Sequence, residues 1–177
     1  YTMVEVEEDD TVEEKPNHPY TIKRFNPDAP AAIEYNNDGT YTLIVSYGGE
    51  TTNMTGSNDA GLLGLDSNLF TVIATKGSTT TAIGLNVANE IRLYHNKDNK
   101  NGSTISFSIN EKAKIVNAKM LYSSDSYNGG TLIVDGQSVV AENKTVYDIN
   151  GTSFSIQNKK EDAQVRIKTI ELTISVK

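Results

Sequence analysis

The chain has 177 residues and a formal net charge of −7, and it contains neither cysteine nor tryptophan. This length suits one ordinary domain, and the lack of cysteine excludes disulfides, zinc–thiolate sites and cysteine nucleophiles. The negative charge argues against nucleic-acid binding because phosphates would be repelled, and no apolar run approaches the roughly 20 residues of a membrane span.

The first 15 residues form an acidic segment. They carry seven carboxylates and one lysine, a composition typical of a solvated tail. Thr2, Val4 and Val6 nevertheless occupy alternate positions, which predicts a short strand able to complete a sheet edge. The PNHP sequence at 16–19 then provides a semi-stiff, extended hinge.

From residue 20 onward, period-2 segments alternate with turn residues, and no stretch of ten or more has convincing helical periodicity. Asn, Asp and Gly pairs mark turns at 36–39, 135–136 and 150–151. A glycine-broken apolar run at 61–65 indicates a buried loop or one helical turn. The predicted strands are 20–25, 32–35, 41–47, 69–75, 91–94, 104–109, 115–122, 131–134, 138–140, 145–149, 153–157 and 163–177.

The last predicted strand, 163–177, changes phase. Val165 and Ile167 share one phase, whereas the apolar residues of 170–176 share the opposite one. Such a slip predicts a β-bulge near 168–169. It would also allow a long strand to serve two sheets at a sandwich corner.

About ten to twelve strands without crossover helices predict an all-β fold. We expect a two-sheet antiparallel β-sandwich of jelly-roll or Greek-key type with an extended N-terminal arm. An immunoglobulin-like sandwich is the competing architecture, although its Cys–Trp–Cys hallmark is missing. Residues 1–19 would form the arm and hinge, and residues 20–177 the single domain.

Four segments carry a resemblance to a known family: FTVIATKGS at 70–78, NEIRLYH at 89–95, TISFSI at 104–109 and VRIKTIELTIS at 165–175. In pattern and order, residues 68–177 resemble the galactose-binding-like jelly-roll modules of bacterial surface and secreted proteins. The resemblance implies a non-catalytic appendage that binds glycans or attaches and spaces other domains. It also implies an extracellular or cell-surface location, with the signal segment absent from the given chain.

The residues give little support for catalysis. His18 and His95 are the only histidines, one in the hinge and one at a predicted strand end, and no G-x-S-x-G surrounds a serine. We therefore predict that the chain is not an enzyme.

Calcium is the ion that the loop oxygens would suit. Neither candidate group has EF-hand spacing, and a plain polar turn is the alternative interpretation of each. The candidate ligands are Asn96, Asp98 and Asn101 in one loop, and Asn58, Asp59 and Asp66 around the glycine-rich loop.

Glycan binding would need an exposed aromatic ring beside amide and carboxylate groups. The loop SSDSYNGG supplies Tyr127 with Asp125 and Asn128, and His95 is a candidate neighbour. The absence of tryptophan weakens this hypothesis, because sugar platforms favour large rings.

The acidic arm suggests assembly. A lone strand is not stable by itself, so residues 2–6 are expected to pair with their own sandwich or, by β-strand addition, with another copy. Pairing between copies is heterologous and would propagate into a polymer. We therefore predict a self-assembling, extracellular bacterial structural protein, filament- or pilin-like. The alternative is a carbohydrate-binding module of a larger secreted or surface protein, stabilised by calcium.

Overall fold

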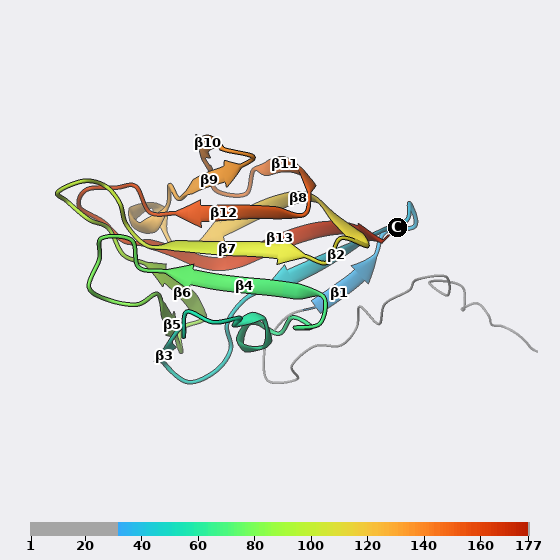
Figure 1. Cartoon of the computed structure of the whole chain (residues 1–177), viewed down its shortest axis with the longest axis horizontal. Helices are drawn as coiled ribbons and strands as arrows, with labels where there is room; N and C mark the ends of the chain where they lie inside the picture. The colour runs from blue at the N-terminus through green and yellow to red at the C-terminus, as the bar shows by residue number, and fades with distance from the viewer. Residues whose placement is uncertain (1–31, 177) are drawn as a thin grey trace, which may run out of the picture.

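The structure is a computed structural model that describes residues 32–176, and it forms two antiparallel sheets packed face to face (Figure 1). The larger sheet contains β1 (Ala32–Tyr35), β2 (Thr40–Val45), β3 (Thr52–Asn53), β5 (Gly84–Asn86), β6 (Glu90–Leu93), β8 (Ala113–Tyr122), β11 (Val146–Gly151) and β13 (Val165–Val176). The smaller sheet contains β4 (Phe70–Thr75), β7 (Thr104–Ile109), β9 (Thr131–Val134), β10 (Gln137–Val140) and β12 (Ser153–Gln157).

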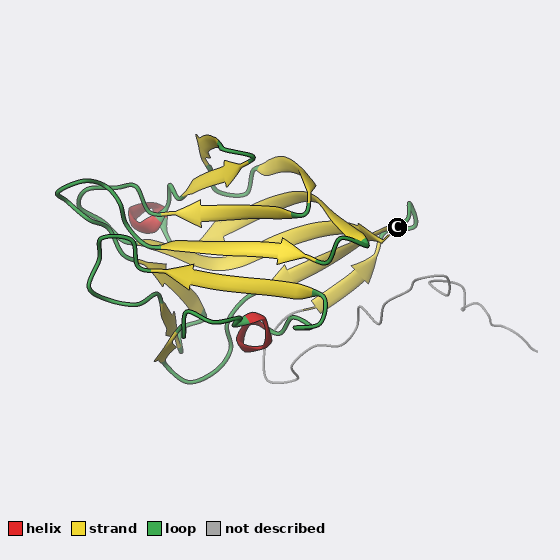
Figure 2. Ribbon diagram, viewed as in Figure 1, coloured by secondary structure: helices red, strands yellow, loops and turns green. Residues whose placement is uncertain are grey.

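The chain passes repeatedly between the two layers. In the smaller sheet the strand order is β10-β9-β12-β7-β4, and in the larger sheet β1-β2-β13-β6-β5-β3, with β8 between β13 and β11. Only two short 3-10 helices occur in the described residues, η2 (Ala60–Leu63) and η3 (Asp125–Tyr127) (Figure 2). The predicted all-β sandwich is confirmed. No helix in this part of the chain is both long and apolar enough to cross a bilayer.

Alternating apolar side chains fill the space between the sheets. On β7 the inward positions Ile105, Phe107 and Ile109 are buried, as predicted. The rings of Phe107 and Phe154 stack with centroids 5.1 Å apart across the β7–β12 pair. Full burial of one such side chain contributes about 1.5–3 kcal/mol, so this alternation supplies the main driving force for folding.

β13 is the central strand of the larger sheet. It pairs with β8 on one side, and on the other with β6 through residues 165–167 and with β2 through residues 170–175. The register with β8 shifts between Ile167 and Thr169, which confirms the predicted bulge. The idea of a strand shared by two sheets is wrong: β13 stays in one sheet and changes its partner strand instead.

The predicted turns are confirmed where the backbone requires positive φ. Asn37 and Gly39 have φ values of 62° and 90° between β1 and β2, and Asp135 and Gly136 have 50° and 78° between β9 and β10. The run at 61–65 lies in and after η2.

The sequence analysis missed two strands, β3 and β5. Both have only two or three residues and thus no visible alternation. The predicted strand at 20–25 lies outside the described residues.

At one end of the sandwich, Asn158 ties several loops together. Its fully buried amide Nδ2 donates to the carbonyls of Leu93 and Ala163, each at 2.9 Å. Its backbone carbonyl accepts from Gly102 N at 3.1 Å, and its N–H donates to Ser103 O at 3.0 Å. This network fixes the loops that surround the ends of β6, β7 and β12.

We expect Gly102→Ala to lower the free energy of unfolding by about 2–4 kcal/mol. A Cβ at this position would overlap the backbone carbonyl oxygens of Asn158 and Tyr94, neither of which can move freely. Urea denaturation measures the loss. Gly61→Ala is the matched control, since a Cβ there meets no atom within 4 Å. Equal urea midpoints for Gly102→Ala and Gly61→Ala would contradict the expected overlap between the added Cβ and the carbonyl oxygens of Asn158 and Tyr94.

Candidate functional site

β10 is an uncovered edge of the smaller sheet. It pairs only with β9, and all four of its residues are exposed. None carries a charge, and Val139 and Val140 have exposed fractions of 47% and 59%. Proteins usually protect such edges with charges, proline or a covering segment, because a bare edge pairs with other chains. β10 contains neither charge nor proline.

The turn at 135–136 determines which backbone groups of β10 are available. Both turn residues have positive φ, as in a two-residue type I′ hairpin, so Val134 and Gln137 form the hydrogen-bonded closing pair. Alternation along the ladder then directs the N–H and C=O groups of Ser138 and Val140 away from β9. These groups face the side on which a further strand would add, although the Val140 carbonyl already accepts a long hydrogen bond from Tyr147 Oη.

The opposite edge of the same sheet, β4, is covered. Asp59 N donates to Val72 O at 2.8 Å, while the side chain of Asn58 accepts from Val72 N at 2.9 Å and donates to Phe70 O at 3.2 Å. The segment before η2 thus occupies outward backbone groups of Phe70 and Val72, in the first half of β4. The two edges of the smaller sheet therefore differ in their capacity to accept a strand.

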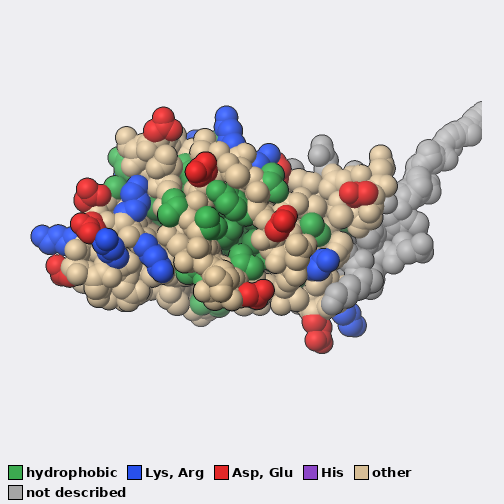
Figure 3. Space-filling model, turned by 90° about the horizontal axis from the view of Figure 1, so that it is seen from above, with side chains coloured by type: hydrophobic (Ala, Val, Ile, Leu, Met, Phe, Trp, Pro, Cys, Tyr) green, Lys and Arg blue, Asp and Glu red, His purple; other side chains and the backbone are tan. Residues whose placement is uncertain are grey.

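Exposed valines extend from β10 to β11. Val146, at the start of β11, has an exposed fraction of 56%. Tyr147 Oη donates to the Val140 carbonyl at 3.4 Å, which holds the two strands together on this side of the molecule. Seen from above, hydrophobic side chains cluster in the middle of this face with charged groups around them (Figure 3). We call Val139, Val140 and Val146 the valine patch.

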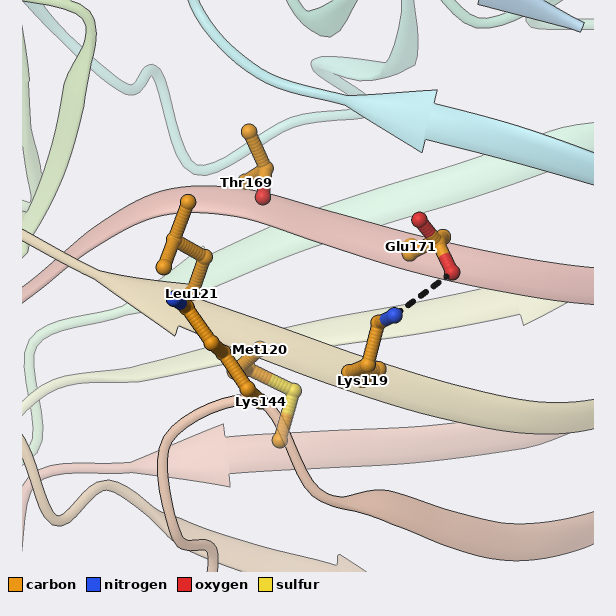
Figure 4. Close-up of a pocket in the computed structure, with 6 residues that line it drawn as sticks. All are labelled: Lys119, Met120, Leu121, Lys144, Thr169 and Glu171. Carbon is orange, nitrogen blue, oxygen red and sulfur yellow. Dashed lines mark ion pairs between the residues drawn. The ribbon is translucent and has the colours of Figure 1, made fainter.

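A shallow hollow adjoins the valine patch on the outer face of the larger sheet (Figure 4). It lies where the β13 bulge shifts the register with β8, and Val146 pairs with Lys119 at its border. The Lys119 ammonium binds the Glu171 carboxylate at 3.2 Å, whereas Lys144 forms no ion pair within the described residues. The lining residues are Lys119, Met120, Leu121, Lys144, Thr169 and Glu171.

Tyr122 anchors the β9–β10 hairpin to the larger sheet. Its side chain is 4% exposed, and its hydroxyl donates to Ala141 O at 2.8 Å and accepts from Gly130 N at 3.1 Å. Ala141 N also donates to Gly130 O at 2.8 Å, which closes the base of the hairpin. Burial raises the pKa of Tyr122 to about 12. The edge strand is therefore held on a rigid, buried support.

The predicted glycan residues are only partly brought together. Asp125, Tyr127 and Asn128 lie in or next to η3, but one face of the Tyr127 ring is covered by the Arg166 guanidinium, 3.8 Å from the ring centroid. His95 lies beyond the end of β6, where its Nδ1 is buried without a hydrogen-bond partner. Within residues 32–176, no hydrogen bond or ring contact joins His95 to Tyr127.

The first predicted calcium loop is held by its own hydrogen bonds. The Nδ2 atoms of Asn96, Asn99 and Asn101 all donate to Ser78, at 3.0, 3.0 and 3.1 Å. Asn96 Oδ1 accepts from the backbone N–H of Asp98 at 3.0 Å. Amide nitrogens, rather than the oxygens that calcium requires, therefore converge here.

The second predicted calcium group is divided between separate turns. Both carboxylate oxygens of the buried Asp59 accept from Thr55, at 2.7 and 2.9 Å. Asp66 instead accepts from Asn68 N at 2.9 Å, and Asn58 covers the β4 edge. In the described part of the chain, no three His, Cys, Asp or Glu side chains are grouped to hold a metal ion. The predicted donor residues Thr2, Val4 and Val6 lie outside that part.

The sequence analysis missed a charged cluster on the outer face of the larger sheet. Arg92 and Arg166 are direct cross-strand neighbours on β6 and β13, and Arg92 binds Glu90 Oε1 at 2.8 Å. Burial alone would raise the pKa of Glu90, but the Ser123 hydroxyl and the two guanidinium groups hold it below its usual value. The alternation of side chains along each strand indicates which residues point outward. It does not show that charged side chains of β6 and β13 become neighbours.

Comparison with known proteins found no counterpart for this chain: no family model, curated protein or solved structure matches it. The resemblance of residues 68–177 to galactose-binding-like modules therefore stays a prediction.

We expect Tyr122→Phe to lower the free energy of unfolding by about 1–3 kcal/mol at neutral pH, because two buried backbone groups lose their partner. In the parent chain, the pKa of Tyr122 is about 12 when folded and near its ordinary value of 10 when unfolded. The stabilisation by the hydroxyl is therefore complete below pH 10 and is lost as the pH rises through 12.

Urea unfolding between pH 8 and pH 12 tests this expectation. The difference between the parent chain and Tyr122→Phe should narrow above pH 10. Tyr127→Phe serves as the control, since its ring lies against Arg166 rather than in the core. A difference that stays constant up to pH 12 would show that the Tyr122 hydroxyl does not titrate as described.

Proposed function

We propose that the chain is a non-catalytic, extracellular structural protein of a bacterial surface, which polymerises by adding residues 2–6 of one copy to β10 of the next. The observation that carries this proposal is the bare β10 edge, with four exposed, uncharged residues on a sheet whose other edge is covered.

The chemistry of the arm suits this edge. If residues 2–6 pair as a strand, Thr2, Val4 and Val6 would share one face of it. Backbone hydrogen bonds to Ser138 and Val140 would supply affinity, and contact between valines would remove apolar surface from water. Because the arm and β10 are different surfaces, each copy can donate and accept at once, which produces an open chain of subunits.

The alternative proposal is a carbohydrate-binding module of a larger secreted protein. It is supported by the partly exposed Tyr127 between the exposed Asp125 and the partly exposed Asn128. A sugar would have to use the ring face that Arg166 leaves uncovered. Binding on a glycan array that Tyr127→Ala abolishes, in a chain that stays monomeric, would favour this alternative over assembly.

We expect the full chain to form multimers at high concentration, and deletion of residues 1–15 to leave monomers. Val140→Lys should also prevent assembly, because a lysine on the edge strand opposes strand addition. Light scattering after size exclusion, together with electron microscopy, measures both effects.

Val87→Lys is the matched control for the edge variant. Val87 is 63% exposed and lies between β5 and β6, away from the valine patch. It should assemble like the parent chain. A full-length parent that remains monomeric at millimolar concentration would overturn the proposal, as would equal assembly of the Val140→Lys and Val87→Lys variants.

A further inference from the structure

The two ends of β10 differ in charge. Its N-terminal end follows the hairpin turn, which carries the exposed carboxylate of Asp135. Its C-terminal end, Val140, lies against the loop after η3, where a Cβ on Gly129 would be 3.9 Å from Val140 Cγ1. The same loop continues into Gly130, whose carbonyl accepts from Ala141 N.

Two cations, Lys160 and Arg166, lie near the Val140 end, where the exposed carboxylate of Glu142 also follows Val140 by two residues. Lys160 Nζ donates to the carbonyl of Asn128 at 3.0 Å, next to Gly129. Arg166 lies over the ring of Tyr127, one residue before Asn128.

Arg166 and Arg92 share one nearby carboxylate, Glu90, and only Arg92 forms an ion pair with it among the described residues. The Arg166 side chain is half-buried, its Nε donates to the neutral Gln164 Oε1 at 2.8 Å, and none of the ion pairs in this part of the chain includes it. Its cross-strand neighbour is another cation, Arg92, which already binds Glu90. Like charges placed opposite each other across strands are destabilising, and a half-buried guanidinium is stabilised by a carboxylate.

The sequence of the arm contains such carboxylates. Directly after the alternating residues 2–6 come Glu7, Glu8, Asp9 and Asp10. If residues 2–6 lie along β10, this acidic run must extend past one end of the strand. In a parallel arrangement it reaches the cations beyond Val140, and in an antiparallel arrangement it meets Asp135.

We propose that the arm of a neighbouring copy adds parallel to β10, with its acidic run 7–10 bound by Arg166 and Lys160. This inference rests on the proposed assembly and specifies its direction. The valine patch contributes apolar contact, and the charge difference along β10 selects one of the two strand directions.

Cysteine pairing tests the direction, because the chain has no cysteine of its own. Two full-length chains are mixed under mild oxidation. The donor carries Ser138→Pro, which blocks its own edge, and either Met3→Cys or Val6→Cys. The acceptor carries Val4→Pro, which disables its own arm, and either Gln137→Cys or Val140→Cys. Disulfides require Cα atoms about 4.4–6.8 Å apart, so they report which ends meet.

Parallel addition predicts that the pairs 3 with 137 and 6 with 140 form at least about tenfold faster than the swapped pairs. Faster formation of 3 with 140 and 6 with 137 would overturn the parallel direction and leave strand addition intact. Failure of all four pairs, together with monomeric parent chains, would overturn the assembly proposal and this inference with it.

Charge variants test the cation site separately. Arg166→Gln should weaken association about fivefold or more at low salt and reduce its salt dependence, and Arg166→Lys should restore most of the loss. Lys76→Gln is the control, because Lys76 is an exposed lysine directly after β4. This substitution should leave the association and its salt dependence unchanged. Removing Glu7 and Glu8 should have no further effect in the Arg166→Gln background. If Arg166→Gln and the removal of Glu7 and Glu8 weaken association independently and additively, this would contradict a direct contact between Arg166 and these carboxylates.

Discussion

The bulge in β13 is the feature on which the larger sheet depends. Without it, the apolar residues on one side of residues 168–169 would point to solvent, because a one-residue slip moves a whole strand segment to the other face. With it, Ile167 and Ile170 are both fully buried. The same shift divides one side of β13 between β6 and β2, and it places the hollow of Figure 4 beside β11.

The two edge strands of the smaller sheet, β4 and β10, differ in how far other segments cover their backbone groups. Asn58 and Asp59 cover β4 with hydrogen bonds, while β10 has only its hairpin partner. The buried hydroxyl of Tyr122 keeps this hairpin in place from within the core. A rigid strand with unpaired outward groups loses little conformational entropy when another strand adds, which is why such an edge suits assembly.

The proposed contact combines two forces with different roles. Backbone pairing and valine burial would determine that the arm binds, but neither depends strongly on strand direction. The interactions of the charged groups depend on strand direction, because Asp135 lies beyond one end of β10 and the two cations Arg166 and Lys160 lie beyond the other. In the proposed contact, the acidic composition of the arm, which by itself only indicated a solvated tail, would serve as an orienting signal.

The sequence by itself determined the local features: the strands, the glycine and asparagine turns, the bulge near 168–169 and the inward faces, because each follows from alternation and backbone preference within a few residues. It failed where residues distant in the chain meet. Tyr127 was predicted to be a free ring, yet Arg166 covers it, and the predicted calcium loop directs its amides to Ser78. Only the tertiary structure decided which edge stays bare, since covering an edge depends on segments far along the chain folding against it.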